Sequence, residues 1–297
     1  MSPESRPSGA DLERTLEAAE MAQYEDFFQA LPSDVKEELG LDVHREGRVL
    51  RLTASGYDHP MFNRVMGVGL DPERAAEAPE AVLDRAAAHY EGAGVPRWMV
   101  QLLPHVEPDG FAGVAGSRGV IRLRGWAKHL GSSRQAVPAR SELRVVRLDP
   151  GVSVGGQSDS RLAEAWADLL VRNIGFPAPF AGWLRALYGR ERWHLYLALH
   201  GDVPVATGGM YLSESDLGPI GQLTFASTLP EHRRRGAQSA LVARRVHDAR
   251  AAGARWIVAE TDEERPDRPN PSTRNLERLG FPVAYVRANW GPPKPED

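Results

Sequence analysis

The stretch "PEHRRRGAQSALVARR", residues 230–245, decides how the rest of the chain is interpreted. Three consecutive arginines, Arg233 to Arg235, and Gly236 stand directly before an alanine-rich segment of helix-forming composition. A helix start already carries partial positive charge, so arginines there are electrostatically unfavourable unless they face an anion. Backbone N–H groups of such a turn can also point at one bound group. The stretch predicts a phosphate or pyrophosphate site; the alternative is a solvated basic helix start.

Bulk composition limits the classes of protein that this chain can belong to. Its 297 residues are 42% hydrophobic, which suffices for one large core or two domains, and its net charge of −4 argues against a binder of polyanions. The absence of cysteine excludes disulfides, thiolate metal sites and acyl-cysteine intermediates. No His/Asp/Glu cluster has metal-ligand spacing, and no stretch has signal-peptide or membrane-span character. We therefore expect a cytoplasmic protein with no metal and no membrane contact.

The chain repeats itself without a gap when residues 72–100 are aligned with residues 230–258. Both windows begin with Pro-Glu and end with Arg-Trp, one residue and a valine, and further matches lie between. Where the second copy has "RRRGAQ" (233–238), the first has "AAEAPE" (75–80), so the anion site is expected in one half only. Two repeated domains are predicted. Coincidence between two Ala/Arg-rich helices is the alternative.

The polar stretch "GSSRQAVPARS" (131–141) is the predicted linker, which divides the chain into domains 1–135 and 136–297. Hydrophobic periodicity and turn residues predict the elements within each domain. The expected helices are residues 11–30, 32–40, 73–93, 160–174, 178–188, 236–252 and 271–279. The expected strands are residues 48–53, 64–70, 97–103, 142–149, 193–200, 203–213, 221–228, 255–261 and 282–289.

The region from Glu142 to Trp290 resembles the GNAT superfamily of acetyl-coenzyme-A-dependent N-acetyltransferases. Their signature, Q/R-x-x-G-x-G/A between a strand and a helix, is matched by Arg233, Gly236 and Gln238, with glutamine where glycine or alanine is usual. The segment "NPSTRNLERLGF" (270–281) is similar to the family's later helix and its Gly-Phe ending. The first half resembles a degenerate copy. The resemblance implies an α/β fold with a mixed sheet and two GNAT-like acyl-CoA N-acyltransferase domains in tandem.

The resemblance also implies where acetyl-CoA would bind. Two neighbouring strands, ending near Thr228 and Glu260, would splay apart and hold pantetheine in the gap, with the pyrophosphate on the arginine turn. For two asparagines, capping of the late helix is the alternative to cofactor binding. The expected cofactor-binding residues are Ala226, Ser227, Thr228, Arg233, Arg234, Arg235, Gly236, Ala237, Gln238, Ser239, Asn270 and Asn275.

An amine that attacks a thioester must lose a proton, and the leaving thiolate must gain one. Glu260, at the end of the strand beside the gap, is the candidate base, and Asp262 is the second; either could instead cap its loop. In many family members a tyrosine protonates the thiolate, but the matching residue here is Leu276. Tyr285 and Tyr211 are possible substitutes, and for both the alternative is a packing role.

The leading hypothesis is an N-acetyltransferase that moves an acetyl group from acetyl-CoA to a primary amine by direct attack in a ternary complex. The acceptor is a small molecule or peptide that the sequence does not identify, and a monomer or homodimer is expected. The second hypothesis is a non-catalytic acyl-CoA-binding or sensing protein. A nucleic-acid-binding module using the arginines is disfavoured by the acidic net charge and the lack of an aromatic-studded basic face.

Overall fold

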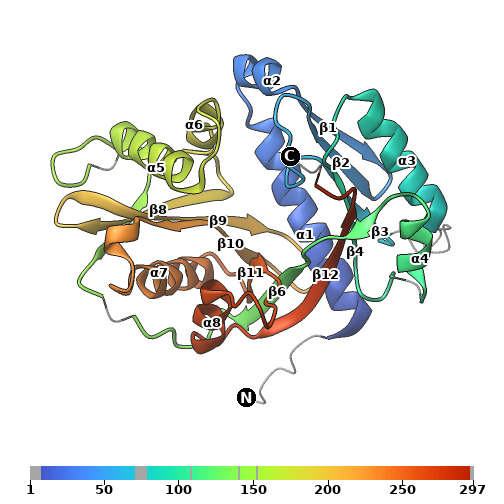
Figure 1. The fold of residues 1–297 in the computed structure, drawn as a ribbon. Helices are drawn as coiled ribbons and strands as arrows, with labels where there is room; N and C mark the ends of the chain where they lie inside the picture. The colour runs from blue at the N-terminus through green and yellow to red at the C-terminus, as the bar shows by residue number, and fades with distance from the viewer. Residues whose placement is uncertain (1–7, 71–78, 108, 140, 152, 295–297) are drawn as a thin grey trace.

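The computed structural model describes residues 8–70, 79–107, 109–139, 141–151 and 153–294. These residues form one mixed β-sheet with helices on both of its faces (Figure 1). The helices are α1 (Gly9–Gln29), α2 (Ser33–Leu39), α3 (Pro79–Gly92), α4 (Phe111–Gly116), α5 (Asp159–Ile174), α6 (Phe180–Arg185), α7 (Ala237–Ala251) and α8 (Pro271–Arg278), with a 3-10 turn η1 (Pro230–His232). The strands are β1 (Leu41–Glu46), β2 (Val49–Ala54), β3 (Arg64–Val68), β4 (Met99–Leu102), β5 (Ile121–Arg122), β6 (Trp126–Ser132), β7 (Arg144–Leu148), β8 (Trp193–His200), β9 (Val203–Ser213), β10 (Ile220–Thr228), β11 (Trp256–Asp262) and β12 (Val283–Gly291).

Helix α5 shows how local sequence sets these elements. Leu162, Trp166 and Leu170 recur at helical spacing and are buried, so this face packs on the sheet. The Ser158 side chain caps the first turn, and Gly175, with φ of 84°, ends the helix in a left-handed conformation. The predicted helix 160–174 is confirmed, and strands 193–200 and 203–213 match β8 and β9.

Several features differ from the sequence-based expectations, which contain no element corresponding to α4, β5 or β6. The predicted linker at residues 131–141 begins inside strand β6, where Gly131 lies against the Phe281 ring: an added Cβ would come within 2.4 Å of it. This glycine therefore permits close packing and does not mark a flexible connection. Strand β1 is not predicted by the pattern, because only Leu41 of its six residues is buried and apolar alternation is missing.

Several helices and strands of the first half correspond to elements of the second half at the positions that the repeat alignment gives. Helix α3 spans Pro79–Gly92 and α7 spans Ala237–Ala251, which agrees with the repeat offset from 72 to 230. Strands β3 and β4 are parallel neighbours in the first half, as β10 and β11 are in the second. Residues 75–78, opposite the arginine turn, lie outside the described residues.

The described residues form a sheet of 12 strands in which the last strand of each half, β6 or β12, pairs with strands of the other half. The sheet order is β1-β2-β3-β4-β12-β6-β11-β10-β9-β8-β7, with β5 paired to β12 beside this path. Strand β12, at the end of the chain, thus pairs with β4 of the first half, and β6 pairs with β11 of the second. Figure 1 shows β12 running between the halves. Because each half is completed by a strand of the other, they cannot separate without breaking backbone hydrogen bonds.

Helix α1 lies at the seam between the halves (Figure 1). Its Phe27 stacks on Trp183 of α6, with ring centroids 3.9 Å apart, and belongs to a buried hydrophobic cluster that includes residues of both halves. The carboxylates of Glu17 and Glu20, on the same helix, are buried within the seam. The first half therefore contributes side chains to the surroundings of the predicted site in the second.

Candidate functional site

The two strands expected to splay apart do so. Strands β10 and β11 pair from Ile220 to Leu223, where the last pair is Leu223 with Ala259, but β10 continues to Thr228 and β11 to Asp262. An irregularity between Thr224 and Ser227 interrupts the pairing of β10 with β9. Phe225, inside it, has φ of 50°, which is unusual for a residue other than glycine. The irregularity bends β10 away and opens a gap beyond Leu223.

A buried arginine holds this irregular strand in place. The Arg245 guanidinium, on α7, donates to the carbonyl oxygens of Gly209 at 3.0 Å and Thr224 at 3.3 Å. Gly208 leaves room for it, because a Cβ there would lie 3.1 Å from the guanidinium carbon. Burial lowers the pKa of Arg245 to about 10, so the group stays protonated at neutral pH. A positive charge therefore lies directly behind the gap.

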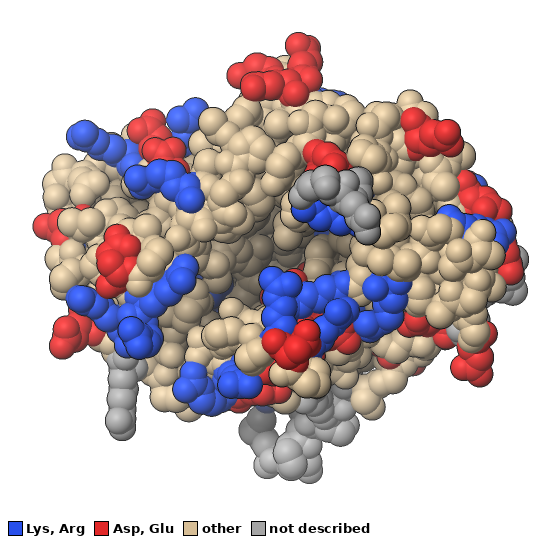
Figure 2. All heavy atoms as spheres, viewed as in Figure 1, with Lys and Arg blue, Asp and Glu red and all other residues tan. Residues whose placement is uncertain are grey.

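A cavity of about 440 Å³ passes through the gap. Side chains of α7 and α8 line one part of it. Side chains of α1 line another part, together with Phe62 and Phe176, which pack in the same hydrophobic cluster as Phe27 of α1. Figure 2 shows the central hollow on this face of the molecule. Such a through-passage suits a reaction in which two substrates meet from opposite sides.

A second cavity of about 50 Å³ adjoins the first at the place where the strands part. Of the residues that line both cavities, only Tyr24 and Glu260 are titratable. We call the residues common to both cavities the junction: Gln23, Tyr24, Leu223, Thr224, Ala259 and Glu260. Sequence reasoning missed Tyr24 because it comes from α1 of the first half, and no motif links that helix to the gap.

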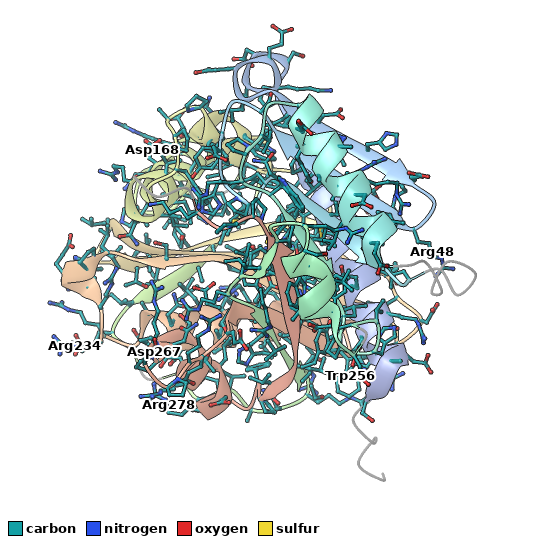
Figure 3. The ribbon with its side chains drawn as sticks, turned by 45° about the vertical axis from the view of Figure 1, so that its right-hand side comes forward. Arg48, Asp168, Arg234, Trp256, Asp267 and Arg278 are labelled. Carbon is teal, nitrogen blue, oxygen red and sulfur yellow. The ribbon has the colours of Figure 1, made fainter. Side chains whose placement is uncertain are left out.

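The arginine turn has the geometry expected of an anion site. Arg234 has φ of 64°, and Gly236, the N-cap of α7, has φ of 77°. Both residues are therefore in the left-handed conformation, and the chain turns sharply just before the helix begins. The first intrahelical bond is from Ala240 N–H to the Gly236 carbonyl, which leaves the N–H groups of residues 237–239 without helical partners. Arg233, Arg234 and Arg235 are all exposed, and Figure 3 shows Arg234 at the outer edge of the molecule. Within the described chain, none of these arginines pairs with a carboxylate.

The remaining predicted cofactor residues fall into two groups. Ala226, Gln238, Asn270 and Asn275 line the cavity. Ser227, Thr228, Ala237 and Ser239 do not, and the Asn173 side chain donates to the Ser227 hydroxyl and the Thr228 carbonyl. Asn270 also caps α8, because its Oδ1 accepts from Ser272 N–H at 3.0 Å. The structure thus brings together the turn, the end of β10 and the start of α8 around one passage.

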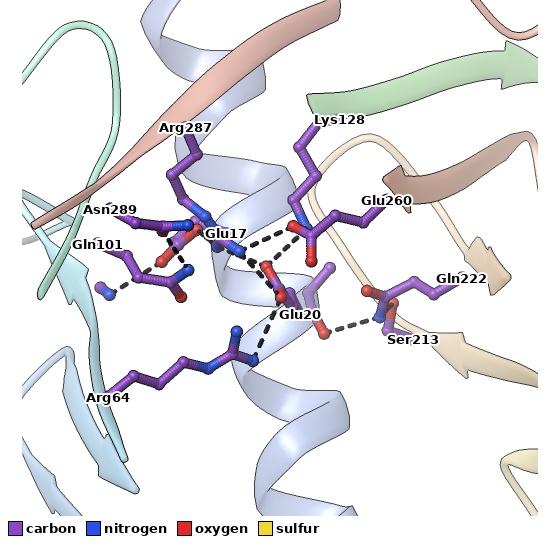
Figure 4. A network of polar contacts seen from close by, with 12 residues as sticks. Glu17, Glu20, Arg64, Gln101, Lys128, Ser213, Gln222, Glu260, Arg287 and Asn289 are labelled. Atoms are coloured by element: carbon purple, nitrogen blue, oxygen red, sulfur yellow. Dashed lines mark hydrogen bonds and ion pairs between the residues drawn. The ribbon is translucent and has the colours of Figure 1, made fainter. Parts of the chain in front are cut away.

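Glu260 lies in the cavity and at the edge of a buried charge network. Its Oε2 accepts from Lys128 Nζ and from Arg287 Nη2, both at 2.8 Å (Figure 4). The same two cations contact Glu20, which Arg64 also approaches. With Glu17, three carboxylates face three cations, so the network is neutral as a whole. The predicted base is present at the gap, but one of its oxygens is already occupied.

The other predicted acid and base candidates lie in different surroundings. Asp262 lines the cavity and pairs with Arg124 at 2.8 Å. Tyr285 is buried without lining either cavity, its hydroxyl has no partner among the described residues, and burial raises its pKa well above 10.0. Tyr211 is buried, with its hydroxyl donating to Ala22 O at 3.4 Å. Leu276 lines the cavity, so an apolar side chain stands where the resemblance leads one to expect a phenol.

A buried histidine ties α8 to the sheet at this site. His129 Nδ1 lies 2.8 Å from Phe281 O, and Nε2 lies 3.0 Å from the Thr261 hydroxyl, which contacts Thr273 of α8 at 2.9 Å. Burial lowers the pKa of His129 below 6.5, and the Phe281 hydrogen bond only partly opposes this.

This environment makes a pH-dependent stability expected. Below pH 6.5 the unfolded chain binds a proton at His129 that the folded chain does not, so the free energy of unfolding should fall as pH is lowered through 6.5. Urea unfolding at neutral and mildly acidic pH measures this slope. His129→Gln, which keeps hydrogen-bonding capacity without the titration, should show a shallower slope; an unchanged slope would contradict the assignment.

Within the part of the chain that the structure describes, no group of three or more His, Cys, Asp or Glu side chains could hold a metal ion. No helix in the described ranges combines the length and apolar character needed to cross a membrane.

Comparison with known proteins finds a family match in the second half. Residues 163–281 match the model of the Acetyltransferase (GNAT) family. The matched segment begins in α5 and ends just after α8, so it includes the splayed strands and the arginine turn. No curated protein sequence matches the chain.

Solved structures share the fold over nearly the whole chain. A GCN5-related N-acetyltransferase from Kribbella flavida has a TM-score of 0.61 at 16% identity, covering 94% of this chain and 96% of that one. A tandem GNAT protein from the clavulanic acid biosynthesis pathway has a TM-score of 0.56 at 14% identity, covering 93% and 96%. A putative GNAT-family acetyltransferase from Novosphingobium aromaticivorans has a TM-score of 0.52 at 15% identity, covering 96% and 100%. At these identities the likeness concerns the fold.

Proposed function

We propose that the protein is an acetyl-CoA-dependent N-acetyltransferase, because residues 163–281 match the GNAT family model and GNAT structures, one of them a tandem protein, share the fold of the chain. It would transfer the acetyl group to a primary amine by direct attack in a ternary complex. The observation that carries this proposal is the open arginine turn at the start of α7, beside the passage between β10 and β11. We also keep the division into domains 1–135 and 136–297 as a proposal.

In this proposal the second half binds the coenzyme. The pyrophosphate would accept hydrogen bonds from the N–H groups of residues 237–239 and from the exposed guanidinium groups of Arg233–Arg235. Pantetheine would extend along Ala226 into the gap, with Gln238 and Asn275 beside it. The thioester would reach the junction, where Arg245 adds a fixed positive charge behind the carbonyl oxygen that becomes an oxyanion.

The junction also offers groups for proton transfer. The amine nitrogen attacks the thioester carbonyl carbon, the carbon–sulfur bond breaks, the nitrogen gives up a proton, and the coenzyme thiolate takes one up. We propose Glu260 as the acceptor of the amine proton, because it lines both cavities. For the acid, Tyr24 is better placed than Tyr285: it lies at the junction, and burial raises its pKa above 10.0, so it is protonated at neutral pH.

A non-catalytic acyl-CoA-binding protein is the second candidate. Two observations favour it: Leu276 stands where many family members have the acid, and Oε2 of Glu260 is held by two cations. Both candidates require the same coenzyme site. They differ in whether free coenzyme A is released when an amine is present.

Replacement of Gly236 by glutamate tests the coenzyme site. Acetyl-CoA at 100 times its Kd should stabilise the wild type by about 2.7 kcal/mol, and this ligand-dependent shift should vanish in Gly236→Glu. The glutamate would place a negative charge at the pyrophosphate position on a backbone with φ of 77°. Thermal shift and calorimetric titration with acetyl-CoA measure the effect.

Gly253→Glu is the matched control. Gly253 follows the other end of α7, has φ of 85°, and has open space around a Cβ, so the variant carries the same charge and a similar backbone strain. It should keep the acetyl-CoA shift. If acetyl-CoA stabilised Gly236→Glu and Gly253→Glu equally, the coenzyme would bind at a site other than the arginine turn. Release of free thiol with a panel of amines then separates enzyme from sensor.

A further inference from the structure

The part of the cavity away from α7 and α8 has an apolar wall. Phe27 of α1 and Phe225 of β10 face each other there, with ring centroids 5.5 Å apart. Phe62 and Phe176, from opposite halves of the chain, meet with ring centroids 5.9 Å apart. Ile174 lines the same region with 46% of its surface exposed. The wall leads directly to the junction, where the acetyl group would be presented.

Each carboxylate that lines this cavity is already paired with a cation, and the remaining charged side chain of the lining is an arginine. Glu260 is paired with Lys128 and Arg287, and Asp262 is paired with Arg124. Arg245, which also lines the cavity, has only carbonyl partners among the described residues. An acceptor with several ammonium groups would lose their hydration in this cavity, and the described residues place no unpaired carboxylate there to form new ion pairs with them. A single amine avoids this desolvation cost, because it must lose its proton and become neutral before it can react.

From this combination we infer that the acceptor is a monoamine on an aromatic or aliphatic carbon skeleton, and not a polyamine or a multiply charged amino sugar. The skeleton packs against Phe27, Phe62, Phe176 and Ile174, and the amine points to Glu260 at the junction. Burial of the skeleton contributes the binding affinity, and the lack of unpaired carboxylates among the described lining residues makes the cavity bind polycationic amines more weakly than monoamines. This inference specifies the acceptor of the proposed transferase and rests on that function for its chemistry, although the pocket can be tested by binding alone.

The test compares 2-phenylethylamine and hexylamine with spermidine and kanamycin. Calorimetric titration of each amine into the wild type, with and without coenzyme A, measures binding without requiring turnover. Free-thiol release with acetyl-CoA then gives kcat/KM for each. We expect the two monoamines to bind about tenfold or more tightly than the polycations, because burial of one such skeleton is worth at least that factor.

Ile174→Asp should weaken 2-phenylethylamine binding about tenfold or more while leaving acetyl-CoA binding unchanged. Ile121→Asp is its matched control, because Ile121 has 47% exposure and does not line the cavity. Ile121→Asp should bind like the wild type. Since both side chains are exposed, neither variant should unfold the protein.

The outcomes separate this inference from the proposed function. Preferential binding of spermidine or kanamycin, absence of monoamine binding, or equal effects of the two aspartate variants would overturn the inference, even if acetyl-CoA binds. If monoamines bind to the wild type and not to Ile174→Asp, but the wild type releases no free thiol from acetyl-CoA, the pocket would be supported and the transferase activity refuted. Absence of acetyl-CoA binding would refute the coenzyme site while leaving the amine comparison decisive for the pocket.

Discussion

Glu20→Gln is expected to lower the free energy of unfolding by about 3–5 kcal/mol, because it removes one charge from a buried ionic network. Glu20 accepts from Lys128 Nζ and Arg287 Nη1, both at 2.6 Å, and Arg64 Nη2 lies 3.5 Å from it. All four side chains are almost fully buried. Glutamine has nearly the same shape, so the loss reports on the charge. Urea unfolding at neutral pH measures it.

Two variants control this experiment. Glu25→Gln, on the same helix, breaks an ion pair with Arg45 that is partly exposed, so its cost should stay below about 1 kcal/mol. The double variant Glu20→Gln with Lys128→Met restores neutrality and should recover part of the loss. A Glu20→Gln loss as small as that of Glu25→Gln would show that the network contributes no more than a surface pair.

The same network predicts an acid dependence. Burial by itself would raise the pKa of Glu20, but Arg287, Lys128 and Arg64 outweigh it and hold the pKa far below 4.5. A lowered pKa in the folded state means that the stabilisation is complete above pH 4.5 and is lost as pH falls towards the folded-state value. Glu20→Gln should therefore lose less stability than the wild type when pH is lowered from 4.5.

Trp183→Ala should lower the free energy of unfolding by about 3–5 kcal/mol, as expected for truncation of a large buried aromatic residue. Trp183 is fully buried, stacks on Phe27 at 3.9 Å and 8°, and packs edge-on against Phe28. Its indole N–H donates to the Phe27 carbonyl at 2.6 Å. The substitution thus removes the main aromatic contact between α6 of the second half and α1 of the first. Urea unfolding gives the size of the loss.

Trp183→Phe keeps a ring beside Phe27 and loses the hydrogen bond, so its cost should be clearly smaller than that of the alanine variant. Since Phe27 also lines the cavity, Trp183→Ala should in addition weaken binding of 2-phenylethylamine. A stability loss below about 1 kcal/mol would show that the surrounding side chains collapse into the space. Equal costs for both variants would assign the effect to the hydrogen bond alone.

Local sequence was sufficient for much of the second half. The helix after the arginine turn, the β8–β9 hairpin and the strands on either side of the gap lie where periodicity and turn residues predict them. The repeat alignment also places α3 and α7 in register. These features depend on residues near one another in the chain, so their physical causes are visible in short windows. The arginine turn belongs to this group: Arg234 and Gly236 take left-handed conformations beside a helix start that lies at most three residues away.

Contacts between the halves were not predictable in this way. Glu260 is the residue expected to act as base, and its two cationic partners come from β6 and β12, the exchanged strands. Tyr24 reaches the junction from a helix about 200 residues earlier in the chain than the gap. A buried ion pair or a cavity wall depends on which surfaces meet in three dimensions, and a single sequence does not specify that choice.

The sequence by itself predicted two repeated α/β units and showed that an arginine–glycine turn precedes a helix in only one of them. Those conclusions follow from side-chain periodicity, glycine conformation and charge at a helix start, which are local properties. Only the tertiary structure decided that the closing strands exchange, that the first half lines the passage and that the carboxylate at the gap is paired. These three features depend on strand pairing and burial between residues that are far apart in the chain, and such contacts are not visible in a short window of sequence.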